Sequence, residues 1–112
     1  MTENLDLARR WLDLENKLEK KFGRKPDVEA VLFLIGIQET GFIRREFSKE
    51  EKQDLMHVAM CTLLMPSGFY EFERRDKEGW LYFKQLKKLS FSSAAEERNF
   101  LKEQILLYFE QL

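Results

Sequence analysis

The sequence is poor in the residues that most often mark a metal site, a disulfide or a thiol catalyst. It contains one cysteine, Cys61, and one histidine, His57, in 112 residues. A lone cysteine cannot form an intramolecular disulfide, and this pair would need further ligands to hold a zinc ion. We therefore expect no metal and no cofactor. The chain opens on polar residues at positions 2–4 and not on a basic and then apolar leader, so we expect a reducing, cytoplasmic location.

The sequence also lacks an excess of one charge and a long apolar run. Lys and Arg number 19 against 20 Asp and Glu, so no overall field attracts nucleic acid or an anionic membrane. The longest apolar run, residues 30–37, is too short to span a bilayer. We expect no membrane partner. Single-stranded nucleic-acid binding is unlikely on net charge, but two local basic clusters leave it open as an alternative: Lys17, Lys20, Lys21, Arg24 and Lys25, and Lys84, Lys87 and Lys88.

What the sequence does contain is enough apolar material for one packed core. Hydrophobic residues make up 44% of the chain and aromatic residues 13%, and this length is typical of one domain. We expect a single domain spanning residues 1–112. Apolar residues recur at three- and four-residue spacing over several stretches. The pattern predicts a mostly α protein (α+β) with about four helices, roughly residues 4–22, 28–40, 49–65 and 93–111.

Local signals mark where these helices begin and end. Glycines stand at two expected helix C-termini, and a serine followed three residues later by glutamate forms a capping-box pattern before the third helix. A serine also precedes the last helix. The residues concerned are Gly23 and Gly41, Ser48 with Glu51, and Ser92 or Ser93.

The second predicted helix, residues 28–40, is apolar on nearly every side. We expect it to be the central and most buried element. Gly36, in its middle, costs about 1 kcal/mol of helix propensity relative to alanine. We therefore expect a neighbouring element to cross close to Gly36, because a residue without a side chain allows a short distance between backbones.

The segment after the third helix is ambiguous, because residues 78–89 could be drawn as a short helix. We favour a β-hairpin, since two aromatic-rich runs, residues 69–75 and 80–86, flank a four-residue loop that ends in Gly79. The expected register gives four cross-strand pairs: Phe72 with Phe83, Glu71 with Lys84, Phe69 with Leu86 and Arg75 with Trp80.

Aromatic side chains fall on both faces of this hairpin. The expected register places Tyr70, Phe72, Leu81 and Phe83 on one face and Phe69, Trp80 and Tyr82 on the other. A two-stranded ribbon covers one face with its own domain, so the second face should be an exposed apolar patch that supports association. Pairing of ribbon edges between two copies would give a homodimer. The alternative is that the last helix or residues 42–47 cover this second face.

Three polar side chains are candidates for a ligand pocket. Glu39 follows the apolar part of residues 28–40, and His57 and Cys61 lie four residues apart on one helix face, where they could form a thiolate–imidazolium pair. The more usual interpretation of such residues is structural. Cys61 stands among apolar residues, as inert buried thiols do, and a polar run such as the one at Glu39 is typical of a helix end.

The run from Tyr70 to Phe83, with its Asp-x-x-Gly-Trp turn, resembles a segment of a family of small bacterial cytosolic proteins of unknown function. The resemblance implies a bacterial, cytosolic origin and no catalytic residue. The sequence thus favours a non-enzymatic protein-interaction or self-association module, with self or another protein as partner and Phe69, Trp80 and Tyr82 at the interface. A small enzyme or ligand-binding domain with a pocket near Glu39 and His57 is the alternative.

Overall fold

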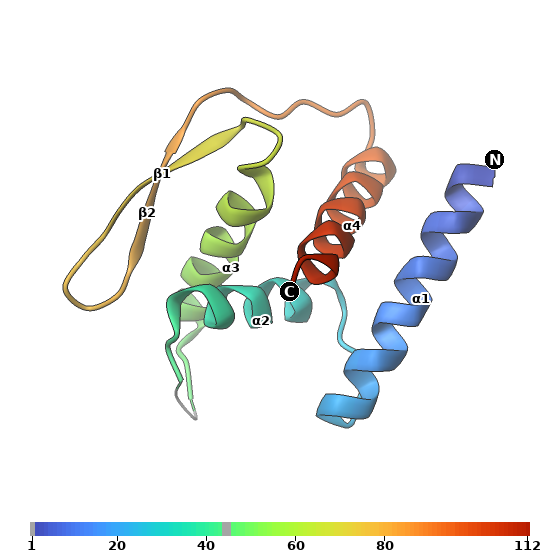
Figure 1. Ribbon diagram of the computed structural model, residues 1–112, viewed down its shortest axis with the longest axis horizontal. Coiled ribbons are helices and arrows are strands. Elements are labelled where there is room, and N and C mark those ends of the chain that lie inside the picture. The colour runs from blue at the N-terminus through green and yellow to red at the C-terminus, as the bar shows by residue number, and fades with distance from the viewer. Residues whose placement is uncertain (1, 44–45) are drawn as a thin grey trace. The chain divides into compact units, whose positions relative to one another are not determined.

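The computed structural model describes residues 2–43 and 46–112 and confirms a mostly α-helical fold with one hairpin (Figure 1). The elements follow in the order α1 (Thr2–Phe22), α2 (Val28–Thr40), α3 (Lys49–Leu64), β1 (Tyr70–Arg75), β2 (Leu81–Gln85) and α4 (Ala94–Glu110). Contacts divide the chain into two compact units, residues 1–27 with 90–112 and residues 28–89. In the part of the chain described, no helix is long and apolar enough to cross a membrane.

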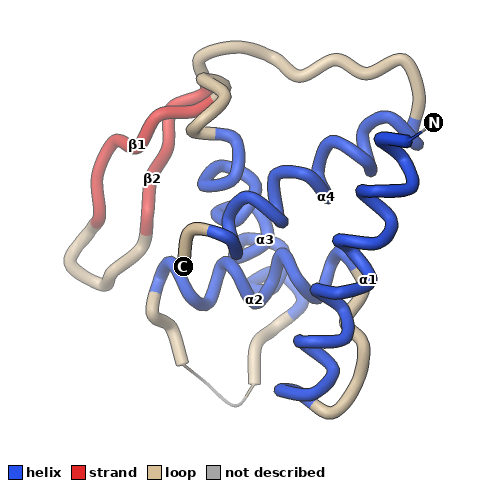
Figure 2. The backbone as a smooth tube through the Cα atoms, turned by 45° about the vertical axis from the view of Figure 1, so that its right-hand side comes forward, coloured by secondary structure: helices blue, strands red, loops and turns tan. Residues whose placement is uncertain are grey.

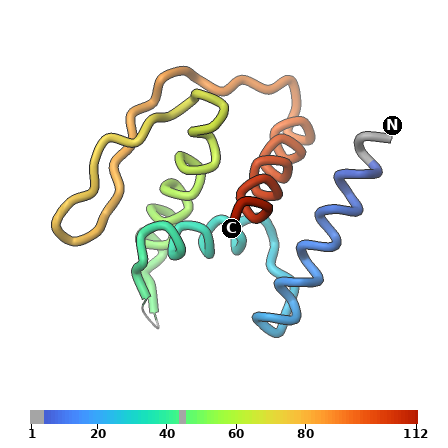
Figure 3. The backbone as a smooth tube through the Cα atoms, viewed as in Figure 1, coloured from blue at the N-terminus to red at the C-terminus, as the bar shows by residue number. Residues whose placement is uncertain are grey.

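The first unit is a pair of helices, α1 and α4, that run side by side in the same direction (Figures 1 and 3). α1 buries one stripe of side chains at helical spacing, and α4 buries two adjacent residues near its C-terminal end. Phe91 and Phe100 add a tilted ring contact with centroids 5.4 Å apart. The buried residues are Leu7, Trp11, Leu14 and Leu18 of α1, and Ile105 and Leu106 of α4.

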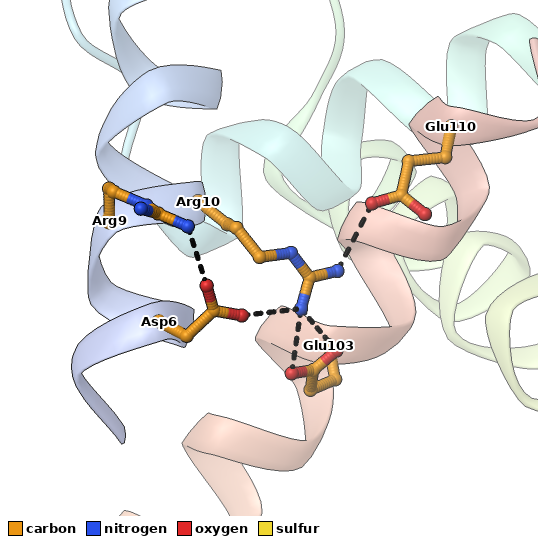
Figure 4. Close-up of polar contacts among 5 residues, drawn as sticks. All are labelled: Asp6, Arg9, Arg10, Glu103 and Glu110. Carbon is orange, nitrogen blue, oxygen red and sulfur yellow. Dashed lines mark hydrogen bonds and ion pairs between the residues drawn. The ribbon is translucent and has the colours of Figure 1, made fainter. Parts of the chain in front are cut away.

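An ion-pair network joins these two helices (Figure 4). The Arg10 guanidinium lies 3.1 Å from a Glu103 oxygen and 3.1 Å from a Glu110 oxygen, both on α4. Asp6, one turn earlier on α1, lies 3.9 Å from the same guanidinium and 2.8 Å from Arg9. The hydrogen bond to Glu110, reinforced by Glu103, raises the pKa of Arg10. The network fixes the lengthwise position of α1 against α4, because one side chain is bound at two points.

In the second unit, α2 crosses α3 at Gly36, as the sequence predicts. A Cβ atom at Gly36 would overlap the backbone carbonyl oxygen of Leu55 and lie 2.7 Å from its carbonyl carbon. Real Cβ atoms essentially never approach other atoms this closely, so the crossing distance requires glycine. The two helix backbones are therefore in direct contact at this point.

The prediction that residues 28–40 form the most buried element is wrong. α3 holds the larger buried set, because α2 and both strands of the hairpin contact it. α2 leaves Phe33, Leu34 and Ile37 half-buried. The buried residues of α3 are Leu55, Val58, Ala59, Cys61, Thr62, Leu63 and Leu64; those of α2 are Val31, Leu32, Ile35, Gly36 and Thr40.

The predicted helix ends are confirmed. The Ser48 hydroxyl accepts a hydrogen bond from the Glu51 backbone N–H (3.1 Å), and the Ser48 N–H donates to the Glu51 carboxylate (2.9 Å), which completes the capping box. Ser93, not Ser92, caps α4 through the backbone N–H of Glu96. The two terminal glycines adopt the left-handed backbone expected of them, with φ of 87° at Gly23 and 75° at Gly41.

Residues 78–89 do not form a helix, and β1 pairs with β2 in an antiparallel hairpin (Figure 2). The predicted pairs Phe72 with Phe83 and Glu71 with Lys84 are confirmed, and the Leu86 N–H donates to the Phe69 carbonyl at 2.8 Å just beyond the strands.

The predicted pair of Arg75 with Trp80 is wrong, because the structure pairs Arg75 with Leu81. The register shifts by one residue between Phe72 and Arg74. A bulge at Glu73 places one extra residue in β1, so every pair nearer the turn moves along by one position. Trp80 therefore lies just outside β2, where its carbonyl accepts a hydrogen bond from the Asp76 N–H at 2.9 Å.

Candidate binding surface at the hairpin tip

The turn of the hairpin is organised around the carboxylate of Asp76. One oxygen accepts hydrogen bonds from the backbone N–H groups of Trp80 (2.9 Å) and Glu78 (3.0 Å), and the other accepts from the Tyr82 hydroxyl at 3.2 Å. These bonds, that from Trp80 foremost, lower the pKa of Asp76. Gly79 completes the turn with a φ of 95°. A single ionised side chain thus holds the loop and the start of β2 in one conformation.

Aromatic and cationic side chains gather around this turn. The Arg74 guanidinium lies 3.9 Å from the centre of the Tyr82 ring, a stacking distance, and Tyr82 keeps 37% of its surface exposed. Trp80 is half-buried and packs on Phe42, with ring centroids 5.7 Å apart. We call Arg74, Asp76, Trp80 and Tyr82 the hairpin-tip cluster.

Arg75 attaches the tip to α2. Its guanidinium donates to the carbonyl of Gly79 at 3.1 Å and to the carbonyl of Glu39, near the C-terminal end of α2, at 3.2 Å. A cation at this end of a helix also interacts favourably with the helix dipole. The hairpin tip is therefore fixed both internally and to the neighbouring helix.

Between the tip, α3 and the residues that lead into α3 lies a surface hollow of about 190 Å³. Its aromatic walls are Phe42, Phe47 and Trp80, its apolar floor includes Leu55, and two carboxylates, Glu51 and Asp54, contribute the polar lining; we call these six residues the aromatic hollow. All of them belong to residues 28–89, the second compact unit.

The walls and the carboxylates of the hollow are held by different contacts. Phe47 packs edge-on against Phe33 of α2, with centroids 5.2 Å apart. Glu51 is oriented by the capping box with Ser48. Asp54 lies three residues further along α3, which places it on the same side of the helix as Glu51, and it is exposed.

The three interface candidates from the sequence do not form one patch. Trp80 and Tyr82 lie at the tip, whereas Phe69 precedes β1 at the opposite end of the hairpin. Phe69 is half-buried, and the Lys87 amino group lies 4.7 Å from its ring centre. Phe42 packs on Trp80, so Phe42 covers part of the face that would otherwise be exposed.

The three pocket candidates lie elsewhere. The Cys61 sulfur lies 3.5 Å from Nε2 of His57, but burial raises the pKa of Cys61 to about 11, so the thiol stays protonated at neutral pH. His57 is exposed and stands edge-on to Tyr70, with centroids 6.4 Å apart. Glu39 is half-buried. None of the three lines the aromatic hollow. Across residues 2–43 and 46–112, no group of three His, Cys, Asp or Glu side chains is placed to hold a metal ion.

The hollow was not anticipated from the sequence as a site. The sequence indicates only that Glu51 belongs to a helix cap, and it offers residues 42–47 as one alternative cover for the second face of the hairpin. The sequence signal for the hollow is the close succession of two phenylalanines and the acidic first turn of a helix. This signal does not indicate that Trp80 completes the aromatic walls. Comparison of the chain with protein-family models, curated proteins and solved structures gives no match.

Proposed function

We propose that this chain is a non-enzymatic protein-interaction module that binds another polypeptide through the hairpin-tip cluster and the adjoining aromatic hollow. The observation that carries the proposal is the concentration of Trp80, Tyr82 and Arg74 at one end of the hairpin. These three residue types are the ones most enriched at binding hot spots. They combine a large contact area with polar groups that can bond to a partner.

The rigidity of the tip supports the same proposal. Asp76 accepts three hydrogen bonds within the turn, and Arg75 bonds to α2. Binding by a preorganised surface loses little conformational entropy, so more of the contact energy contributes to affinity.

The mixed polarity of the tip favours a separate partner over a permanent homodimer. Tyr82 is exposed at 37%, and it is surrounded by Arg74 and Asp76. Obligate homodimer interfaces are larger and more apolar than this, whereas interfaces that form and dissociate have a polar composition close to that of the general surface. The ribbon-edge dimer expected from the sequence is therefore the competing outcome of the test.

The test is a selection of peptides from a random displayed library on the 112-residue chain, with light scattering to measure its mass in solution. Enriched peptides are expected to lose binding to a Trp80→Ala/Tyr82→Ala variant and to keep it in Phe22→Ala, which removes a half-exposed aromatic ring from the other compact unit. Circular dichroism checks that each variant is folded. Peptides that bind both variants equally, or a dimer that the double variant abolishes, would contradict the proposal.

The alternative suggested by the sequence is a small enzyme or ligand-binding domain with a pocket near Glu39 and His57. The contacts of these residues favour the aromatic hollow over that location, since the hollow is where a concave surface and polar groups coincide.

A further inference from the structure

The aromatic hollow has the chemistry of a site for a cation. Of the six described residues that line it, three present aromatic rings, two present carboxylates, and none is cationic. The face of an aromatic ring is negative, so it attracts an ammonium or guanidinium group placed over it, and tryptophan does so best. Carboxylates at the same opening add a direct charge attraction.

The size of the hollow limits what can enter. Its volume of about 190 Å³ corresponds to roughly six water molecules at about 30 Å³ each. A lysine or arginine side chain has a similar number of non-hydrogen atoms. A hollow of this size therefore admits one long basic side chain and excludes a folded element.

The two carboxylates differ in their availability. Glu51 is engaged in the capping box through one oxygen, which accepts from the Ser48 N–H at 2.9 Å. Asp54 is exposed, and among the described residues it makes no hydrogen bond or ion pair. At the neighbouring hairpin tip, the Arg75 guanidinium is bound to the carbonyls of Gly79 and Glu39. Asp54 is thus the carboxylate that a ligand would meet first.

From this arrangement we infer that the aromatic hollow binds a basic side chain, lysine or arginine, presented by the partner polypeptide. The aliphatic stem lies along Leu55 and the rings of Phe42 and Phe47, and the charged head faces Trp80 and Asp54. This inference rests on the proposed function, because the cation is carried by the partner chain. It adds that the partner must present a lysine or arginine side chain.

The experiment is a titration of the ¹⁵N-labelled 112-residue chain, followed by NMR. The ligands are N-acetyl-lysine methylamide, its uncharged counterpart N-acetyl-norleucine methylamide, and tetramethylammonium as a free cation. The chain has two tryptophans, so the indole N–H of Trp80 reports on the hollow and that of the buried Trp11 serves as the internal reference. We expect the lysine compound to shift the Trp80 signal, and its affinity to fall as salt rises from ~0.01 M to ~1 M.

Two variants separate the charge from the apolar contacts. Asp54→Asn keeps the shape and removes the charge, and should weaken the lysine compound about fivefold, as expected for one unit charge at ~4 Å in a solvated setting. Glu50→Gln is the matched control, since Glu50 is exposed on the same helix and does not line the hollow. Phe47→Leu keeps apolar bulk but removes a ring, and should also weaken binding.

Equal binding of the lysine and norleucine compounds, or an equal effect of Asp54→Asn and Glu50→Gln, would overturn the inference. If tetramethylammonium binds as tightly as the lysine compound, the hollow is a site for a free cation, and the claim that a partner polypeptide supplies the cation is refuted. The peptide selection keeps the two proposals separate. If its enriched peptides require Trp80 and Tyr82 but contain no basic residue, the interaction module stands and the cation site fails.

Discussion

Replacing Gly36 with alanine offers the sharpest test of how α2 and α3 are packed. On helix propensity alone, Gly36→Ala should stabilise the protein by about 1 kcal/mol. The structure predicts the opposite, because the new Cβ would overlap the Leu55 carbonyl oxygen and lie 2.7 Å from the carbonyl carbon. Both are backbone atoms, so no side-chain rotation can relieve the overlap.

The magnitude follows from how far the helices must separate. Restoring an ordinary contact requires a displacement of about 0.5–1 Å, which removes a quarter to a half of the dispersion attraction between facing atoms. Overpacking of a core costs about 1–3 kcal/mol, and a backbone obstacle belongs at the upper end. With the propensity gain of about 1 kcal/mol subtracted, we expect a net loss of about 2 kcal/mol. The melting temperature should fall by roughly 8–12 °C.

The assay is urea unfolding of the wild type, Gly36→Ala and a reference pair at Gln38, an exposed position of the same helix. The difference between Gln38→Ala and Gln38→Gly measures the propensity gain without the steric effect. Adding that gain to the loss found for Gly36→Ala yields the cost of the overlap. A Gly36→Ala protein as stable as the wild type would refute the close crossing of α2 and α3.

Three further predictions concern single groups. Asp76→Ala should disorder the hairpin turn, measured by NMR, whereas Asp76→Asn should keep most of the turn ordered. Because the pKa of Asp76 is lowered in the folded chain, the stabilisation by its carboxylate is complete above the ordinary pKa near 3.8. That stabilisation is lost as the pH falls below this value. Arg10→Met and Glu103→Gln should show a coupling of about 1 kcal/mol in a double-mutant cycle, and additive effects would contradict the network. Native Cys61 should react with iodoacetamide at least ~100-fold more slowly at pH 8 than in the unfolded chain, and comparable rates would contradict its burial.

Local sequence signals predicted most of the fold because each one acts over a few residues. The capping box at Ser48 and the terminal Gly23 and Gly41 are complete within one turn of chain. Gly36 could be identified as a crossing point because its cost to the helix needs a compensating contact. Which residue would make that contact, Leu55, could not be known without the packing of α3.

The register of the hairpin could be predicted only in part from local signals. The pairs from Glu71 to Phe72 agree with the prediction because a direct aromatic and charge match favours them. No glycine marks the bulge at Glu73, and the two residues that follow it towards the turn, Arg74 and Arg75, are both charged, so neither is preferred on the apolar face. Nothing local therefore distinguishes the bulged from the regular register.

The aromatic hollow could not be predicted for a different reason. It requires Phe42 and Trp80, far apart in the chain, to meet beside the first turns of α3. That meeting depends on the direction in which the hairpin leaves α3 and on the bond from Arg75 to the Glu39 carbonyl, neither of which follows from residue spacing. The candidate pocket has separate local origins: Glu39 follows an apolar helix run, and His57 shares a helix face with Cys61. Neither signal indicates whether Glu39 and His57 meet in the fold.

The division of the chain has a consequence for its synthesis on the ribosome. α1 is made before α4, and residues 28–89, which form a unit of their own, are made between them. At about 5–20 residues per second, roughly 4–18 s pass between the end of α1 at Phe22 and the end of α4 at Glu110. During this interval the apolar face of α1, with Trp11 at its centre, has no helix α4 to cover it, while the unit that carries the hairpin can already be complete.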